Sequence, residues 1–187
     1  MPLKRSDEEK IKGTNVSVSD FWRWAYSDLL SNRNRGILAE FLVGNALGLT
    51  DEARIEWDKA DFEYHGKLIE VKSGAYIQAW KQRQLSNIVF NIPKAKSWDY
   101  KTGEMSQDSK RNSDCYVFCV YQDQDKTNYD VLDVSRWEFY VLSTDFLNHH
   151  FFEHKSISLS TIQKSCEATT YAHLKHKIDN VLNDGSC

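Results

Sequence analysis

The chain of 187 residues contains no apolar run near the roughly 18 residues that a membrane-spanning helix requires. Its first ten residues lack an apolar signal core, which argues against secretion. Its four cysteines show no close-pair spacing, so a disulfide scaffold is not indicated and a reducing compartment fits better. These absences predict a cytoplasmic protein without a membrane partner.

The composition also lacks any strong excess of charge, since the formal net charge is only −3. This value does not by itself indicate nucleic-acid binding, which would then depend on local basic patches. Hydrophobic residues at 41% and charged residues at 27% are ordinary for a soluble globular chain. The length suits a single domain, 1–187, with a proper core. Residues 1–13 are polar and are expected to be mobile.

The segment 61–72 predicts a β-hairpin with two carboxylates and a lysine on one face. Its centre, His65-Gly66, suits a tight turn that needs positive φ. Pairing about this turn places Asp61 opposite Glu70, and opposed Cβ atoms lie about 4.5–5.5 Å apart. Because side chains alternate between faces, Lys72 joins the two acids. The same register gives the pairs Phe62–Ile69 and Glu63–Leu68, and the other face carries Ala60, Phe62, Tyr64, Ile69 and Val71.

Opposed carboxylates are unfavourable on a sheet unless something positive lies between them. Oxygen ligands at this separation suit Mg²⁺, which uses one or two carboxylates, and the Val71 carbonyl could add a third ligand. Lys72 could then orient or deprotonate an attacking water, or stabilise developing negative charge. The alternative is a solvated hairpin face on which Lys72 and Lys67 neutralise the acids.

A third carboxylate lies on an apolar helix that the sequence predicts over 34–48. Asn34 or Asn32 could cap its start and Gly48 could end it. Glu40 lies within the apolar stripe, which is costly unless the charge is paired or bound to a cation. We expect Glu40 near the metal, directly or through water; the alternative is a pair with an arginine such as Arg35 or Arg54. Gly44 could let this helix approach the sheet closely.

The order of a Glu-bearing helix, an Asp-bearing strand, a tight turn and a Glu-x-Lys strand resembles the PD-(D/E)XK nuclease superfamily, which includes restriction endonucleases, Holliday-junction resolvases and repair nucleases. The resemblance spans about residues 33–80 and rests on Glu40, Asp61 and Glu70-Val71-Lys72, while Ala60 stands where the superfamily name has proline. It implies a restriction endonuclease-like core and phosphodiester hydrolysis that depends on Mg²⁺, with Mn²⁺ as a substitute and no organic cofactor. It implies that Asp61 and Glu70 hold the metal, that Lys72 serves the water or the transition state, and that Glu40 is an auxiliary acid.

DNA is the expected partner, and the segment after Lys72 is the first candidate for contact with its backbone. The candidate side chains are Ser73, Tyr76, Gln78 and Lys81, with surface solvation as an equal alternative. The basic content of 93–113, interpreted as a long loop, also suits phosphate contact. Double-strand cutting by one small domain would ordinarily require a homodimer.

The remaining pattern predicts an α/β domain with a mixed central sheet flanked by helices. A helix is expected to begin after Ser17 or Ser19 and to run through Leu29 and Leu30, with its aromatic residues in the core. Strands are expected over 53–57, 88–92, 114–121, 137–142 and 156–159. Helices are expected over about 143–152 and 169–182, and a turn with a short helix is expected within 73–83. The strand over 53–57 would make a three-stranded antiparallel element with the hairpin.

Two other classes of function remain open. One is a catalytically silent member of the fold that binds nucleic acid or a protein. The other is a small-molecule metallohydrolase that uses the same carboxylates. Zinc binding by the His150/His154 or His173/His176 pairs is disfavoured, because no matching carboxylate or cysteine pattern accompanies them.

Overall fold

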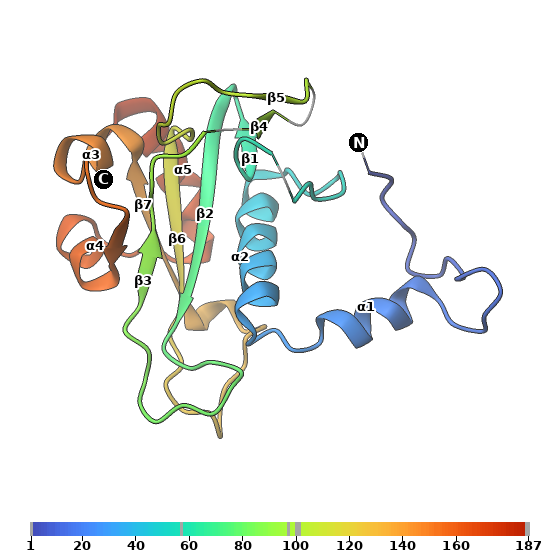
Figure 1. Ribbon diagram of the computed structural model, residues 1–187. Helices are drawn as coiled ribbons and strands as arrows, with labels where there is room; N and C mark the ends of the chain where they lie inside the picture. Colours follow the sequence, from blue (N-terminus) through green and yellow to red (C-terminus); the bar gives the residue numbers. More distant parts are fainter. Residues whose placement is uncertain (1, 57, 97, 100–101, 186–187) are drawn as a thin grey trace.

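Four strands form a mixed β-sheet at the centre of the computed structural model, which describes residues 2–56, 58–96, 98–99 and 102–185 (Figure 1). The strand order is β1-β2-β6-β7, with the bounds Phe62–Tyr64, Lys67–Ala75, Cys115–Tyr121 and Trp137–Ser143. β2 and β6 are parallel, whereas β1–β2 and β6–β7 are antiparallel. The predicted α/β domain with a mixed central sheet flanked by helices is confirmed.

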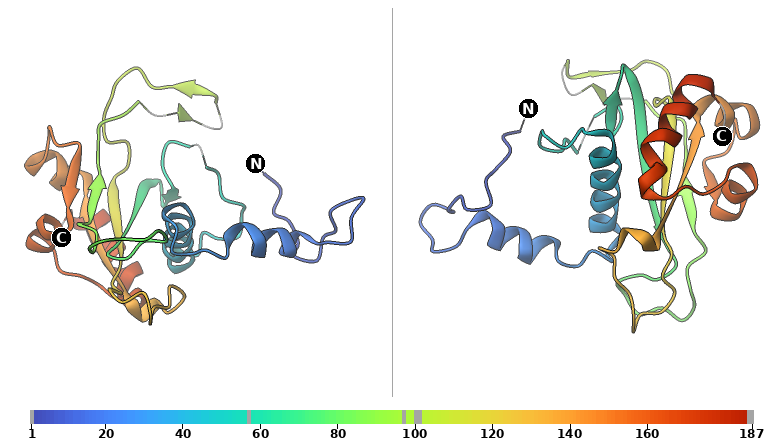
Figure 2. Two further views of the ribbon diagram at one scale, coloured as in Figure 1. Left: turned by 60° about the horizontal axis from the view of Figure 1, so that its bottom comes forward. Right: turned by 180° about the vertical axis from the view of Figure 1, so that it is seen from behind.

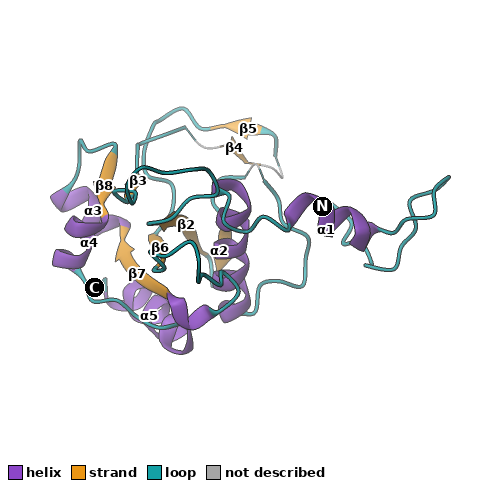
Figure 3. Cartoon of the chain, turned by 90° about the horizontal axis from the view of Figure 1, so that it is seen from below, coloured by secondary structure: helices purple, strands orange, loops and turns teal. Residues whose placement is uncertain are grey.

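Two layers cover opposite faces of this sheet, as the views in Figures 2 and 3 show. One layer consists of α2 (Asn32–Leu47) and α5 (Tyr171–Asp184). The other consists of α3 (Thr144–His150), α4 (Leu159–Ser165) and the antiparallel pair of β3 (Val89–Asn91) with β8 (Ser156–Ser158). A second small pair joins β4 (Trp98–Asp99) to β5 (Glu104–Met105), and a 3-10 turn, η1, spans Val134–Arg136. None of the described helices is long and apolar enough to cross a membrane.

The burial of strand β6 explains the continuous apolar run over Cys115–Tyr121. Every one of its residues is buried, because alternate side chains enter the two cores on opposite faces of the sheet. Cys115, Val117 and Cys119 face α2 and α5, while Tyr116, Phe118 and Val120 face α3 and α4. The strands predicted over 114–121 and 137–142 are therefore confirmed as β6 and β7.

The β1–β2 hairpin has the predicted register, with Phe62 opposite Ile69 and Glu63 opposite Leu68. The two turn residues both have positive φ, 51° at His65 and 75° at Gly66. This conformation is available to glycine without steric cost and matches the twist of two antiparallel strands. The turn fixes the register, and the register brings residue 61 level with Glu70.

Helix α2 is close to its predicted extent, but its start is different. Ser31 is the N-cap, and its hydroxyl accepts a hydrogen bond from the Asn34 backbone at 3.4 Å. The prediction of Asn34 or Asn32 as the cap is wrong. The Asn34 side chain is instead buried and donates to the carbonyls of Ala25 and Asp28, which holds the corner between α1 and α2. Gly48 ends the helix in the left-handed conformation, as predicted.

Gly44 lies where α2 meets the hairpin, and an added Cβ would be 2.7 Å from the tip of the Phe62 ring. We expect Gly44→Ala to destabilise the fold by about 1 kcal/mol, because the ring must move. Gly36→Ala in the same helix has open space around it and is expected to stabilise by up to about 1 kcal/mol through helix propensity. Urea unfolding measures both changes. Shifts of the same sign would contradict the close approach.

Helix α1 (Val18–Tyr26) projects from the body of the molecule, as Figure 1 shows. Its predicted start after Ser17 is confirmed, since Ser17 and Asp20 form a reciprocal capping pair. The prediction that it runs through Leu29 and Leu30 is wrong, because the chain turns after Tyr26 toward the corner held by Asn34. The prediction that its aromatic residues fill the core is also wrong, since none of its residues is buried.

The chain on either side of the hairpin differs from the prediction. Residues 53–56 form no strand, and residue 57 lies outside the described residues. The prediction of a three-stranded antiparallel element is therefore wrong. Arg54 turns instead to α2, which leaves β1 at the edge of the sheet. The helix expected within 73–83 is also absent from these described residues, because β2 continues to Ala75 and the Gln82 side chain then binds the backbone of the following turn.

The second half of the chain follows the predicted order more closely. The strands at 88–92 and 156–159 are confirmed as β3 and β8, and the helices at 143–152 and 169–182 as α3 and α5. The loop 93–113 contains the short pair β4–β5, which the sequence did not indicate. Helix α4 was also missed, although Ser158 caps it with a hydrogen bond from the Thr161 backbone.

Candidate functional site

Asp61 directly precedes β1 and points to the adjacent strand. Its Oδ2 accepts a hydrogen bond of 2.7 Å from the backbone N–H of Val71. Continuing the hairpin register by one residue places Asp61 opposite Glu70. The hydrogen bond therefore fixes one carboxylate beside the Glu70-Val71-Lys72 segment, at the edge of the sheet where β1 begins.

The Val71 carbonyl is directed to this same edge. Leu68 shows the alternation, because its N–H and its carbonyl both bond to Asp114, on the β6 side of β2. The N–H and C=O of one strand residue face the same neighbouring strand, and successive residues alternate between the two neighbours. Val71 comes three residues after Leu68, so its backbone groups point the opposite way, toward β1. The Val71 N–H confirms this direction by its bond to Asp61. The carbonyl thus faces the edge beyond the first residue of β1.

Glu70 and Lys72 lie on the face of β2 that carries Tyr116 and Phe118 on the neighbouring strand. The Lys72 ammonium forms an ion pair with Glu70 Oε1, and the Ser113 hydroxyl lies 3.5 Å from Glu70 Oε2 as a donor. The Glu70 side chain is 24% exposed and the Lys72 side chain is 30% exposed, so both keep solvent access. The expected neutralisation of acids by Lys72 is thus present at Glu70.

Lys67 behaves differently from Lys72. It pairs with Asp114 at 3.3 Å, near the turn of the hairpin. The alternative interpretation of the face, in which both lysines neutralise the two acids, therefore holds only for Lys72. Asp61 accepts a hydrogen bond from the Val71 N–H and forms no ion pair within the described residues.

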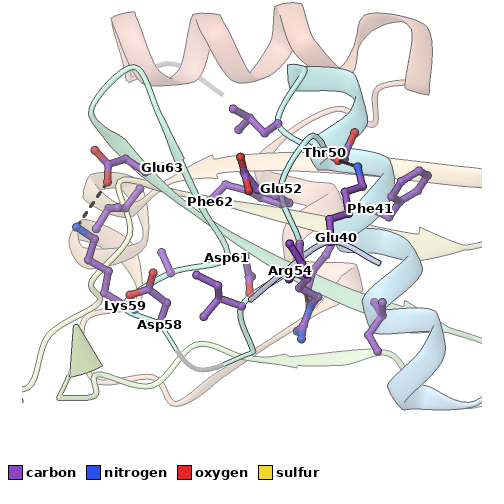
Figure 4. A pocket seen from close by; sticks show the side chains of 18 of the residues that line it. Glu40, Phe41, Thr50, Glu52, Arg54, Asp58, Lys59, Asp61, Phe62 and Glu63 are labelled. Carbon is purple, nitrogen blue, oxygen red and sulfur yellow. Dashed lines mark hydrogen bonds and ion pairs between the residues drawn. The ribbon is translucent and has the colours of Figure 1, made fainter. Parts of the chain in front are cut away.

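Glu40 lies on α2, where its carboxylate forms an ion pair with the guanidinium of Arg54, with one bond of 2.8 Å. The Glu40 side chain is only 15% exposed. The arginine pairing that the sequence left open is therefore present, with Arg54 rather than Arg35. Figure 4 shows Glu40 and Arg54 beside Asp61.

The pKa of Asp61 reflects its burial first and its acidic neighbours second. Burial, followed by the nearby charges of Glu70 and Glu40, raises the pKa of Asp61 to about 7, while the Val71 N–H and Lys72 act in the opposite direction. Burial and like charges both disfavour the ionised carboxylate and leave its negative charge poorly compensated. A divalent cation would compensate this charge.

The available donors suit a hard cation with few protein ligands. They are the carboxylates of Asp61 and Glu70 and the carbonyl of Val71. Within the described residues, no three His, Cys, Asp or Glu side chains gather into a larger ligand set. Mg²⁺ commonly takes one or two carboxylates and keeps several waters, so this donor set fits it better than it fits Zn²⁺ or Ca²⁺.

Without a bound cation, the stability of the protein is expected to fall as the pH rises from about 4 to about 7. The folded pKa of Asp61, about 7, lies above its unfolded value of about 3.9, so the folded state binds more protons in this window. The stabilisation is complete below the unfolded pKa and is lost as the pH passes the folded pKa. Unfolding midpoints in chelator should show a steeper decline for the wild type than for Asp61→Asn. Parallel curves would contradict the shift.

The four side chains predicted to contact DNA after Lys72 differ in their burial and in their hydrogen-bond partners. Gln78 is buried, where its Oε1 accepts from Arg35 and its Nε2 donates to the Ala75 carbonyl. Ser73 accepts a hydrogen bond from Arg35 on the α2 face. Tyr76 is half-buried against the core of α3 and α4, and Lys81 is exposed. Two of the four side chains thus have structural partners, and Lys81 is the most accessible.

The basic segment 93–113 also divides into structural and accessible parts. Arg111 is buried and donates four hydrogen bonds within the protein, to one side chain and three carbonyls. Lys94 pairs with Glu153 and lies over the Phe152 ring. Lys110 is exposed, and Lys101 lies outside the described residues. The expected phosphate contacts therefore remain a prediction for the exposed lysines alone.

A cavity of about 660 Å³ adjoins Asp61, and sequence reasoning did not foresee it. Its walls come from the N-terminal arm (residues 3–26), helix α2 and the segment 49–63. Asp61 and Glu40 line it together, whereas Glu70 and Lys72 do not. Figure 4 also shows Lys59 and Glu63, joined by an ion pair, on its wall. Trp22, which the sequence pattern assigned to the core, is the residue of α1 that lines this cavity.

No protein-family model, curated protein or solved structure matches this chain.

Proposed function

We propose that this protein is a Mg²⁺-dependent deoxyribonuclease with a restriction endonuclease-like core of the PD-(D/E)XK type, acting as an endonuclease in restriction or DNA repair. The observation that carries the proposal is the hydrogen bond from the Val71 N–H to Asp61. It fixes an aspartate beside a Glu-x-Lys strand, in the register that the His65-Gly66 turn predicts. The mixed central sheet and the glutamate on α2 also support the proposal.

The metal would be held by the carboxylates of Asp61 and Glu70 and by the Val71 carbonyl. When bound, Mg²⁺ or Mn²⁺ supplies polarisation of a phosphoryl oxygen and a lowered pKa of bound water. Lys72 would leave its pair with Glu70 to orient the attacking water or to stabilise charge that develops on the phosphoryl oxygens. Glu40, held by Arg54, would act as an auxiliary acid beside Asp61.

Incubation of the purified protein with plasmid DNA tests this proposal. Nicking or linearisation is expected with Mg²⁺ or Mn²⁺ and not with chelator. Asp61→Asn should abolish it, because the amide lacks the charge that holds the cation, while Asp145→Asn on the exposed start of α3 should not. Cleavage that persists in chelator, or in Asp61→Asn, would overturn the assignment. Linear products would further indicate a homodimer, since each copy carries one such site.

One observation favours a second candidate, a catalytically silent nuclease fold that binds nucleic acid. Lys72 and Glu40 both lie in ion pairs, with Glu70 and Arg54 respectively. A silent protein would bind DNA in the same experiment without cutting it in any metal. Turnover of a small phosphoester, with neither binding nor cleavage of DNA, would instead indicate a metallo-phosphoesterase.

A further inference from the structure

The cavity beside Asp61 lies between the N-terminal arm and the body of the protein. The arm is held at its base by Asn34, which donates to the carbonyls of Ala25 and Asp28. Near its other end, Lys4 Nζ donates to the Thr50 carbonyl at 2.8 Å. Figures 1 and 2 show the arm turning back from α1 toward the body. The arm therefore closes one side of a space that already contains Asp61.

Aromatic and aliphatic side chains form much of the wall. Trp22 contributes from α1, Phe41 from α2 and Phe62 from β1. Trp22 and Phe41 remain 37% and 53% exposed, so their rings are accessible to a ligand. Exposed aromatic rings of this kind are the platforms on which single-stranded nucleic-acid ligands stack their bases.

The charges of the lining nearly cancel, since four basic and five acidic side chains contribute. Two of the basic groups are paired within the wall, Arg54 with Glu40 and Lys59 with Glu63. The interior thus suits a neutral group with apolar faces and polar edges. Its volume of about 660 Å³ lies in the range of small-molecule sites and exceeds what one base and its sugar need.

We propose that this cavity receives one unstacked base of the nucleic-acid strand whose phosphate lies at Asp61 and Glu70. This inference rests on the proposed function and names its substrate class: single-stranded DNA, or duplex that is locally opened. Asp61 lines the cavity and belongs to the proposed phosphodiester site, so the two places share this residue. A base inside an intact duplex is stacked on both sides and cannot enter without being extruded.

Binding measured without cleavage tests the inference. Fluorescence anisotropy in chelator would compare a labelled single-stranded oligonucleotide with the duplex of the same sequence. The wild type should bind the single strand at least about tenfold more tightly, and Trp22→Ala should lose about tenfold, or about 1.4 kcal/mol, as expected for one lost stacking platform. Phe41→Ala should weaken binding in the same direction.

Trp24→Ala is the matched control, because Trp24 lies in the same helix, is 84% exposed and does not line the cavity. It should leave the affinity within about twofold of the wild type, since no stacking platform is lost. Circular dichroism would establish that all three variants fold. Equal losses for Trp22→Ala and Trp24→Ala, or equal affinity for single strand and duplex, would overturn the inference.

A 2-aminopurine base placed in the single strand gives a second readout. Its fluorescence should be quenched on binding to the wild type and recover in Trp22→Ala, because stacking on the indole is lost. Unchanged fluorescence in both proteins would overturn the base site. Single-strand binding that depends on Trp22, without cleavage in Mg²⁺, would reject the nuclease and keep the base site. Metal-dependent cleavage that does not depend on Trp22 would reject the base site and keep the nuclease.

Discussion

Replacing Lys72 by alanine is expected to lower the rate of metal-dependent DNA cleavage by at least about 100-fold, the loss typical when one electrostatic stabiliser of a transition state is removed. The Lys72 ammonium pairs with Glu70 and acts on the charge of Asp61, so it lies at the proposed reaction centre. Binding of the divalent cation should persist or strengthen, because a positive charge leaves the site. Single-turnover cleavage and Mn²⁺ titration measure the two effects separately.

Lys67→Ala is the control for this prediction, since Lys67 lies in the same strand and pairs with Asp114 instead. Its cleavage rate should stay within about twofold of the wild type, as expected for an exposed ion pair. If Lys72→Ala cleaves at the wild-type rate, Lys72 has no role in the reaction. If it loses Mn²⁺ binding together with cleavage, its role is structural.

Arg111→Met is expected to destabilise the fold by about 1–3 kcal/mol, the range for leaving a buried hydrogen-bond acceptor without its donor. The Arg111 side chain is buried and donates to the carbonyls of Ile92, Phe151 and His154 and to the Asn148 side chain. Methionine fills similar space but cannot donate, so these acceptors would lose their partner, and the buried Ile92 carbonyl would be left unpaired. Urea unfolding gives the change directly.

Lys110→Met is the matched control, because the neighbouring Lys110 is exposed and its substitution should change stability by no more than about 0.5 kcal/mol. Similar losses for the two variants would contradict the structural role of Arg111. The comparison also separates stability from DNA binding. Only the exposed lysine remains a candidate for phosphate contact in this segment.

The parts of the fold that the sequence predicted are those that local pattern controls. The hairpin register follows from a positive-φ turn at His65-Gly66 and from alternation on either side. Strand β6 follows from an uninterrupted apolar run, and the end of α2 follows from Gly48. The placement of Asp61 opposite Glu70 needed no more than this register, so the centre of the candidate site could be derived before any coordinates.

The parts that were missed depend on contacts between residues far apart in the chain. The composition of α1 is typical of a core helix, yet the helix projects outward because the corner held by Asn34 directs it there. Arginine is usually a surface residue, so nothing in the sequence indicated that Arg35 and Arg111 are buried. Their structural roles are visible only in the carbonyl and amide groups to which they donate. The cavity beside Asp61 exists only when the arm, α2 and the segment 49–63 meet.

Direct measurement of Mn²⁺ binding, by titration calorimetry on the wild type and on Asp61→Asn, tests the central claim that the hairpin holds a divalent cation. Glu104→Gln, which removes an exposed acid on β5, is the control for a general loss of negative charge. The wild type is expected to bind Mn²⁺ at a saturable site from which Mg²⁺ displaces it. Glu104→Gln should keep this site, and Asp61→Asn should lack it. A wild type without such a site, or an Asp61→Asn variant that binds equally well, would contradict it.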